Sequence, residues 1–189
     1  MIDIVFGGVF NPPTLAHYNA CQMIQQSYPV RRFIFVPVGR NYIYKDVIDS
    51  VHRFEMVRLM AKELGAEVSS VELNSDTFIG SYQTMKRLAL TNAKFLLGSD
   101  NLASFPSWLD AEKLLQEYGI IVIRRQQDID AIIAKSAMLT KYRSHILVIN
   151  EFDMPISSSF VRKFKDHSLV IKSVADYIET HGLYEDANE

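Results

Sequence analysis

The chain has 189 residues, of which 48% are apolar and 22% are charged, and its formal net charge at pH 7 is −2. This composition excludes a disordered chain, a collagen-like repeat and a disulfide-stapled scaffold. The near balance of charge argues against a protein that coats nucleic acid or an anionic membrane, so we expect neither partner, while a local basic pocket for a small phosphate ligand stays open.

The length predicts a single domain, with an α/β core over residues 1–150 and a helical C-terminal part over residues 151–189. The N-terminus lacks the basic flank and the long apolar run of a signal peptide, and no stretch approaches the roughly 20 apolar residues of a membrane span. The single cysteine, Cys21, falls on the buried face of a predicted helix, and we interpret it as a core residue. We therefore expect a soluble protein of the cytoplasm.

Short apolar runs along the chain predict buried strands, at residues 2–6, 33–36, 67–71, 94–97, 120–123 and 146–149. Between them, Ser50 is the predicted N-cap of a helix that buries Val51 and closes at Gly65. Further helices are predicted at 81–90, 110–118 and 129–138. Apolar strands that alternate with helices indicate an α/β fold with a doubly wound parallel sheet, covered on both faces.

The last stretch reads as two consecutive helices with no strand between them. The first begins at Ser157 or Ser158 and places Phe160 and Phe164 on one face, and the second ends in a Schellman stop at Gly182. We interpret this part as a helical C-terminal extension of the α/β domain.

The segment from Gly7 to His17 follows the first predicted strand. In an open α/β sheet, ligands bind at the carboxyl ends of the strands, and glycines there let backbone amides approach a ligand closely. A helix that starts near Thr14 adds free N–H groups and a dipole that attract an anion, and Thr14 and His17 share one of its faces. The alternative is a tight turn followed by a core histidine, since the loop matches neither the phosphate-loop pattern nor the dinucleotide glycine fingerprint.

Two further segments could contact a nucleotide. Arg162 lies one helical turn after Ser158, so a hydroxyl and a guanidinium could converge on one phosphate, although serines at a helix start are also ordinary N-caps. After the strand at 94–97, Gly98 and Asp100 suit a carboxylate that accepts from ribose hydroxyls. The sole tryptophan, Trp108, could stack on a heteroaromatic ring or could pack against one end of the sheet.

In this order, these segments resemble the nucleotidylyltransferase superfamily that carries an H-x-G-H signature near its N-terminus and an I-S-S-T-x-x-R signature near its C-terminus. Within it, the chain looks most like the bacterial nicotinate mononucleotide adenylyltransferases, and the resemblance covers nearly the whole length. Residues 80–84, similar to the family's Ser-Tyr-Thr segment, and residues 177–184 support it. The resemblance implies a Rossmann-like fold.

The chain departs from the family pattern at several positions. Thr14 stands in place of the first signature histidine, Ala16 in place of the signature glycine and Ser159 in place of the threonine. Gln83 replaces the threonine that lies beside the pyridine ring, which puts the choice of substrate in question. The basic loop after the second strand appears in altered form at residues 40–45.

The resemblance implies attack by the 5′-phosphate of nicotinate mononucleotide on the α-phosphorus of ATP, giving deamido-NAD and pyrophosphate. It gives His17 the role of donor to the α-phosphate, with the Thr14 hydroxyl as a weaker donor beside it. Ser157, Ser158 and Arg162 would hold the β- and γ-phosphates, bridged by a Mg²⁺ ion that ATP carries without a protein ligand.

The other residues carried over by the resemblance form two groups. The ATP group comprises Gly8, Val9, Phe10, Gly98, Asp100, Arg124 and Lys45. Arg124 and its neighbour Arg125 would border adenine through backbone groups, with their charges simply solvated. Lys45 would reach the phosphates or is a solvated loop residue. The pyridine nucleotide group comprises Tyr82, Gln83, Thr84, Asn101, Trp108 and Leu109.

Two alternative functions stay open. One is a sister enzyme that uses nicotinamide mononucleotide or phosphopantetheine; Thr14 favours pantetheine, whereas the Trp108 segment favours a pyridine substrate. The other is a degenerate nucleotide-binding sensor without turnover, which the lost histidine suggests and the retained His17, Ser158 and Arg162 oppose. A homo-oligomer is compatible with the sequence.

Overall fold

The computed structural model describes residues 1–39, 47–150, 152 and 154–185. Within them, parallel strands form one sheet in the order β3-β2-β1-β4-β5-β6, which confirms the predicted α/β, Rossmann-like fold. The strands are β1 (Ile2–Gly8), β2 (Val30–Pro37), β3 (Glu67–Val68), β4 (Ala93–Gly98), β5 (Ile120–Ile123) and β6 (Ile146–Ile149).

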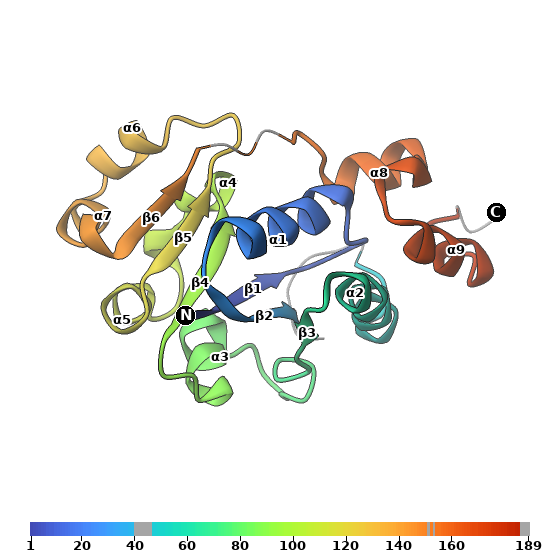
Figure 1. Cartoon of the computed structure of the whole chain (residues 1–189), viewed down its shortest axis with the longest axis horizontal. Helices are drawn as coiled ribbons and strands as arrows, with labels where there is room; N and C mark the ends of the chain where they lie inside the picture. The colour runs from blue at the N-terminus through green and yellow to red at the C-terminus, as the bar shows by residue number, and fades with distance from the viewer. Residues whose placement is uncertain (40–46, 151, 153, 186–189) are drawn as a thin grey trace.

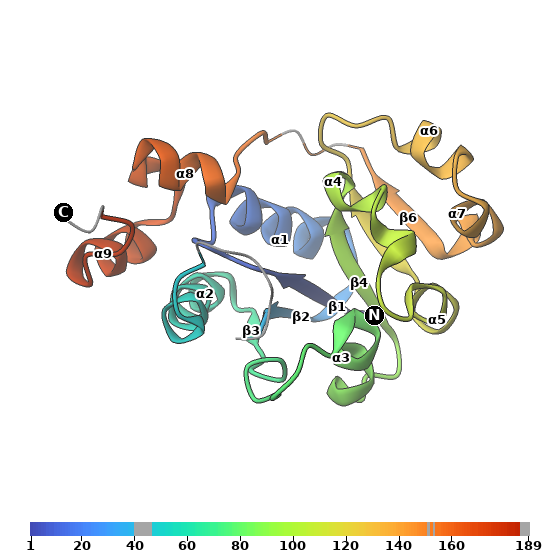
Figure 2. The same cartoon turned by 180° about the vertical axis from the view of Figure 1, so that it is seen from behind.

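Helices cover both faces of the sheet (Figures 1 and 2). The α-helices are α1 (Leu15–Ser27), α2 (Ser50–Leu64), α3 (Gly80–Leu88), α4 (Ser99–Leu102), α5 (Ala111–Glu117), α6 (Ile129–Ala134), α7 (Ala137–Lys141), α8 (Ser158–Phe164) and α9 (Lys172–Thr180). Short 3₁₀ helices lie at Phe105–Ser107, Arg143–His145 and His167–Leu169. No helix of the described residues is both long and apolar enough to cross a membrane.

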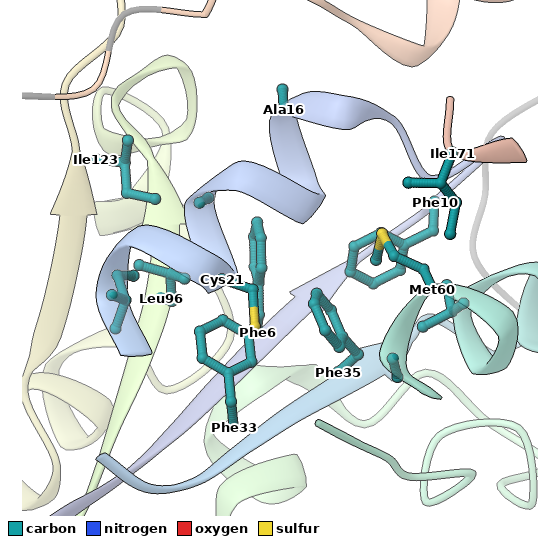
Figure 3. Close-up of a cluster of buried hydrophobic side chains, with 14 of the residues drawn as sticks. Phe6, Phe10, Ala16, Cys21, Phe33, Phe35, Met60, Leu96, Ile123 and Ile171 are labelled. Carbon is teal, nitrogen blue, oxygen red and sulfur yellow. The ribbon is translucent and has the colours of Figure 1, made fainter. Parts of the chain in front are cut away.

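Successive residues of the strands point to opposite faces of the sheet, so the core has two halves. Ile4 and Phe6 of β1 join the half beneath α1, α2 and α9, whereas Val5 joins the half beneath α3 and α5. Figure 3 shows the first half, in which aromatic rings of β1 and β2 pack against α1 and α2. Cys21 is fully buried there, which confirms its interpretation as a core residue.

Local side-chain chemistry corrects the start of α2. The Asp49 carboxylate, and not Ser50, caps the helix by accepting a hydrogen bond from the Val51 N–H at 2.9 Å. The prediction of Ser50 as the cap was wrong because a stronger acceptor lies one residue earlier. Val51 is 55% exposed instead of buried, and Arg53 takes a place on the buried face. The stop at Gly65, with φ of 60°, is confirmed.

Serine side chains account for two further differences. The single helix predicted at 129–138 is in fact two, because the Ser136 hydroxyl accepts from the Leu139 N–H and starts α7 anew. The strand predicted at 67–71 ends at Val68, and the Ser69 hydroxyl then accepts from the Val71 N–H in a turn.

The C-terminal helices pack on the α/β core. Val174 and Ile178 of α9 are buried in the same apolar cluster as α1 and α2. The Schellman stop is confirmed: Gly182 has φ of 57°, and the Leu183 N–H donates to the Ile178 carbonyl at 3.0 Å. The division of the chain at residue 150 stays a prediction. Both views place α8 beside the N-terminal end of α1 (Figures 1 and 2), which brings the C-terminal helices to the loop after β1.

Candidate active site

The sheet order reverses between β1 and β4, which are neighbours. In such sheets, ligands bind at the carboxyl ends of the two strands at the reversal point. A cavity of about 680 Å³ opens there. Its wall includes Gly7, Gly8 and Val9 at the end of β1 and Leu97 and Gly98 at the end of β4.

His17 lies in the first turn of α1; it does not line the cavity, but its ring is 5.7 Å from that of Phe6, which does. Its Nδ1 is 3.0 Å from the backbone nitrogen of Thr14 and 2.9 Å from the Thr14 Oγ1. Because a backbone N–H can only donate, Nδ1 is the acceptor, and the ring proton is on Nε2. Burial, together with the positive charge of Arg125, lowers the pKa of His17 to about 3. At neutral pH, His17 is therefore an uncharged ring that can donate one hydrogen bond from Nε2.

The Thr14 side chain supports this ring. Thr14 is the N-cap residue of α1 and is 1% exposed. Its hydroxyl lies against His17 Nδ1, so the geometry gives Thr14 the work of orienting the imidazole. The role of Thr14 as a second donor to phosphate stays a prediction.

The N-terminal loop and helix α8 are joined by direct hydrogen bonds. The Ser158 hydroxyl donates to the Pro12 carbonyl at 2.7 Å, and Arg162 Nη1 donates to the Asn11 carbonyl at 2.5 Å. The Tyr184 hydroxyl donates to the Asn11 side chain at 2.8 Å. Two signatures almost 150 residues apart are thus joined at the loop that leads into α1, the helix that carries His17.

Ser157 has the capping role that was the alternative for this helix. Its hydroxyl accepts from the Phe160 N–H at 3.1 Å, and α8 begins at the next residue. The two serines therefore have different roles: Ser157 caps the helix, and Ser158 bonds it to the N-terminal loop. Contacts of either serine with phosphates stay predictions.

Phe10, expected at the ATP side, faces the core. It is 2% exposed and its ring packs edge-on against Phe6, at a centroid distance of 5.7 Å, and against His17, at 5.1 Å. Its φ of 50° turns the backbone sharply after β1. Phe10 thus holds the loop and the imidazole in place by packing.

Sequence analysis missed Arg53, which fixes the ends of two strands. This arginine of α2 is 2% exposed, and it donates to the Val9 and Val38 carbonyls, each at 2.8 Å, and to the Ile48 carbonyl at 3.2 Å. A charged residue on the apolar face of a predicted helix is the signal that could have identified it. Its partners could not be identified, because they are carbonyls that the fold alone brings near.

Trp108 packs against the end of the sheet, as one of its two interpretations predicts, and its stacking on a ligand ring stays a prediction. Its ring lies 5.2 Å from that of Phe105 and 6.2 Å, nearly perpendicular, from that of Phe95, so it packs the end of the sheet. It also lines the cavity, together with Asn101 and the 54% exposed Leu109. One aromatic face is therefore placed where a flat ring could stack.

The segment 82–84 contributes less to the cavity wall than the resemblance implies. The Tyr82 hydroxyl donates to Glu117 Oε1 of α5 at 2.6 Å, and Gln83 is exposed on α3; neither lines the cavity. Because α3 begins at Gly80, the residues that face the cavity are Gly80 and Ser81. Direct contacts of residues 82–84 with a pyridine nucleotide stay predictions.

Thr84 acts on the cavity through Glu72, which sequence analysis also missed. The buried Thr84 hydroxyl donates to Glu72 Oε1 at 2.6 Å, and Glu72 lines the cavity. Burial raises the pKa of Glu72, while the hydrogen bonds from Thr84 and from the Gly39 backbone, and the charge of Arg53, oppose that rise. Among the described residues that line the cavity, Glu72 is the one with an acidic or basic side chain.

Two arginines follow β5 near the exposed Asp100. Arg124 Nε donates to Asn150 Oδ1 at 2.7 Å, whereas Arg125 Nη1 lies 3.7 Å from Asp100 Oδ2. Both backbone N–H groups are occupied: that of Arg124 by the Ile149 carbonyl and that of Arg125 by the Ser99 hydroxyl, each at 2.9 Å. The border to adenine expected from Arg124 would therefore have to use its carbonyl.

Lys45 and the altered basic loop at 40–45 lie outside the described residues. Within the described residues, no group of three or more His, Cys, Asp and Glu side chains is placed to hold a metal ion. The groups near His17 and α8 are hydroxyls, amides and guanidinium nitrogens, which bind phosphate oxygens.

Comparison with known proteins identifies relatives over the full length. A sequence profile of the cytidylyltransferase-like family matches residues 5–164. A probable nicotinate-nucleotide adenylyltransferase of Acholeplasma laidlawii is 33% identical, over 97% of each chain. One of Caldicellulosiruptor bescii is 32% identical, over 95% of this chain and 97% of its own.

Solved structures agree on the fold. The nicotinic acid mononucleotide adenylyltransferase of Plasmodium falciparum, complexed with NaAD, superimposes with a TM-score of 0.77 at 24% identity, over 97% of this chain and 98% of its own. With the curated relatives, the matching profile and the joined signatures, the family is established: the chain belongs to the cytidylyltransferase-like family and, within it, to the nicotinate-nucleotide adenylyltransferases.

Proposed function

We propose that this protein transfers the adenylyl group of ATP to nicotinate mononucleotide, giving deamido-NAD and pyrophosphate, as a step in NAD biosynthesis. The observation that carries the proposal is the junction of the N-terminal loop with α8, through the Ser158 bond to Pro12 and the Arg162 bond to Asn11. This junction joins the loop after β1 with the start of α8, the two segments that would bind the phosphates, and the same loop begins at Gly8 and Val9, which line the cavity at the β1/β4 edge. The names of the curated relatives support the same reaction.

The chemistry requires alignment more than activation. An oxygen of the mononucleotide 5′-phosphate forms a bond to the α-phosphorus of ATP, and the bond from that phosphorus to the bridging oxygen breaks, so that pyrophosphate leaves with the electron pair. The nucleophile is already ionised, so a general base is not needed. Holding two reactants in line can contribute about 7–11 kcal/mol.

His17 supplies the fixed donor in this scheme. Its Nε2–H is aimed by the Thr14 contacts on the opposite ring nitrogen, and it would donate to a non-bridging oxygen of the α-phosphate. One preorganised donor at developing charge is typically worth about 3–4 kcal/mol. Ser157, Ser158 and Arg162 would bind the β- and γ-phosphates at the start of α8.

Magnesium would enter with the nucleotide. The donors described near α8 are hydroxyls and a guanidinium, which fit the triphosphate oxygens and leave the ion to the triphosphate itself. When bound, Mg²⁺ neutralises charge on the leaving pyrophosphate. Both substrates are charged nucleotides that do not cross membranes unaided, which supports a cytoplasmic location.

A pyrophosphate-release assay tests the proposal against the two alternatives. Nicotinate mononucleotide, nicotinamide mononucleotide and phosphopantetheine are each offered with ATP and with CTP. We expect turnover with nicotinate mononucleotide and ATP. Preference for another acceptor would identify a sister enzyme, and no turnover with any acceptor, with ATP still bound, would identify a nucleotide sensor.

A further inference from the structure

The Arg125 side chain lies over the carboxyl end of β4. A Cβ atom placed on Gly98 would sit 2.2 Å from Asp100 Oδ1 and 3.2 Å from Arg125 Nε, so the absence of a side chain at position 98 leaves room for the Asp100 carboxylate first and for this guanidinium beside it. Position 98 begins the segment that the resemblance assigns to ribose. Arg125 is also near enough to His17 for its charge to lower the pKa of that ring. Its guanidinium thus lies beside Gly98 and Asp100, and its charge reaches the imidazole.

This guanidinium is incompletely bonded. Its Nε is buried and has no hydrogen-bond partner among the described residues. The ion pair from Nη1 to Asp100 measures 3.7 Å, which is too long for a hydrogen bond. Buried polar groups without a partner are rare and costly in native proteins, and at a ligand site they indicate an acceptor that the ligand supplies.

Within the described part of the chain, neither residue of the N-terminal signature brings positive charge to the α-phosphate. His17 is uncharged at neutral pH, and the family's first signature histidine is Thr14 here, a residue that cannot carry charge. Arg162 is bonded to the Asn11 carbonyl at α8. Among the described residues, Arg125 is the cation whose charge acts on the His17 ring, and its Nη1 lies 3.7 Å from Asp100 Oδ2.

We infer that the Arg125 guanidinium binds a non-bridging oxygen of the ATP α-phosphate and works with His17 Nε2 on the charge that develops there. Arg125 is then a further catalytic residue, acting through its side chain, whereas its backbone N–H is held by Ser99. This inference rests on the proposed function for the identity of the nucleotide. The binding of phosphate by Arg125 can nevertheless be measured without turnover.

The test compares Arg125→Met and Arg125→Lys with Arg87→Met, which removes an exposed arginine at the far end of α3. Calorimetric titration gives the affinities for α,β-methylene-ATP and for adenosine, which lacks phosphate. Arg125→Met should weaken binding of the ATP analogue about 10- to 100-fold, and Arg125→Lys should weaken it less, because a charged hydrogen bond is lost in full or in part. Adenosine affinity should fall by about 3-fold at most, since adenosine offers this guanidinium a ribose but no phosphate oxygen.

Two results would overturn the inference: an unchanged affinity for the analogue in both variants, or an equal loss for adenosine. If Arg125→Met does not fold, as judged by its thermal unfolding, Arg125→Lys decides alone, and wild-type affinity and kcat in that variant would refute the role. Wild-type turnover is measured separately. An inactive wild type whose analogue binding still depends on Arg125 would refute the proposed function and leave the phosphate contact standing.

Discussion

At the scale of single residues, the site depends on one imidazole held in one tautomer. The Thr14 backbone and hydroxyl fix Nδ1 of His17 as an acceptor, and Phe10 packs against the ring. A ring fixed in this way donates from Nε2 without reorganising during the reaction, which is where a preorganised donor gains its effect.

Replacement of His17 by alanine should therefore lower kcat by about 100-fold or more, the loss typical of one donor to developing negative charge. Steady-state kinetics with saturating ATP and nicotinate mononucleotide measure it. His145→Ala is the matched control, because His145 is exposed at the amino end of β6, the edge of the sheet opposite the site. A His17 variant with near wild-type kcat would remove the imidazole from the mechanism.

The same histidine should make stability depend on pH. Its folded pKa of about 3 is below the ordinary 6.5, so between these values the unfolded chain binds a proton that the folded chain does not. The contribution of the neutral His17 to the free energy of unfolding is fully present above pH 6.5. It is lost as the pH falls toward 3, by at most about 1.4 kcal/mol per pH unit for one proton. Urea unfolding at pH 7, 6 and 5 should thus show a steeper loss for wild type than for His17→Gln. If the free energy of unfolding fell equally with pH in wild type and in His17→Gln, the assignment of a neutral His17 would be contradicted.

At the scale of elements, α8 acts as a clamp on the loop after β1. The tie depends on two carbonyls, those of Asn11 and Pro12, which accept from Arg162 and Ser158. On the other side of the loop, Arg53 of α2 holds the Val9 carbonyl. The loop that would cradle the phosphates is therefore fixed by donors from α2 and from α8, and its shape depends on the packing of both helices.

Ser158→Ala should loosen this clamp. It leaves the Pro12 carbonyl without its donor, which should lower the free energy of unfolding by about 1 kcal/mol. It should also raise the KM for ATP more than the KM for the pyridine nucleotide. Ser159→Ala is the control, since the Ser159 hydroxyl is exposed and pairs with Ser157 Oγ. If both substitutions changed the free energy of unfolding and the KM for ATP equally, the bond from Ser158 to Pro12 would have no role in stability or in ATP binding.

The segment after β4 forms the other wall, and Trp108 is its aromatic surface. Trp108→Ala should raise the KM for nicotinate mononucleotide about 10-fold or more, the cost of one lost stacking contact, with a smaller effect on the KM for ATP. Trp108→Phe should restore part of the loss because it keeps a flat ring. Initial-rate kinetics with each substrate varied in turn separate the two constants, and an effect on ATP alone would refute the stacking role.

At the scale of the whole molecule, much of the fold follows from local patterns. The strands β5 and β6 begin and end where uniform runs of isoleucine, leucine and valine predict them. The break between α6 and α7 was missed because Ser136 acts as a cap only when its hydroxyl meets the Leu139 N–H, which residue type alone does not settle.

Residues of the candidate site could be proposed from the sequence where they occur in signatures, and could not where their position depends on contacts across the fold. His17, Ser158 and Arg162 could be identified from the sequence because they occur at family positions. Arg53 and Glu72 could not, because their partners, such as the Val9 carbonyl and the Thr84 hydroxyl, are distant in the chain. Tyr82 shows the converse, since its hydroxyl bonds with α5 although it occupies a family position.

The central claim is that the loop after β1 and the start of α8 hold one triphosphate between them. A crystal structure with α,β-methylene-ATP and nicotinate mononucleotide tests it most directly. The account predicts an α-phosphate oxygen within about 3.5 Å of His17 Nε2, the outer phosphates at the start of α8 and the pyridine ring against Trp108. A triphosphate bound away from both the Asn11–Pro12 loop and α8 would contradict it.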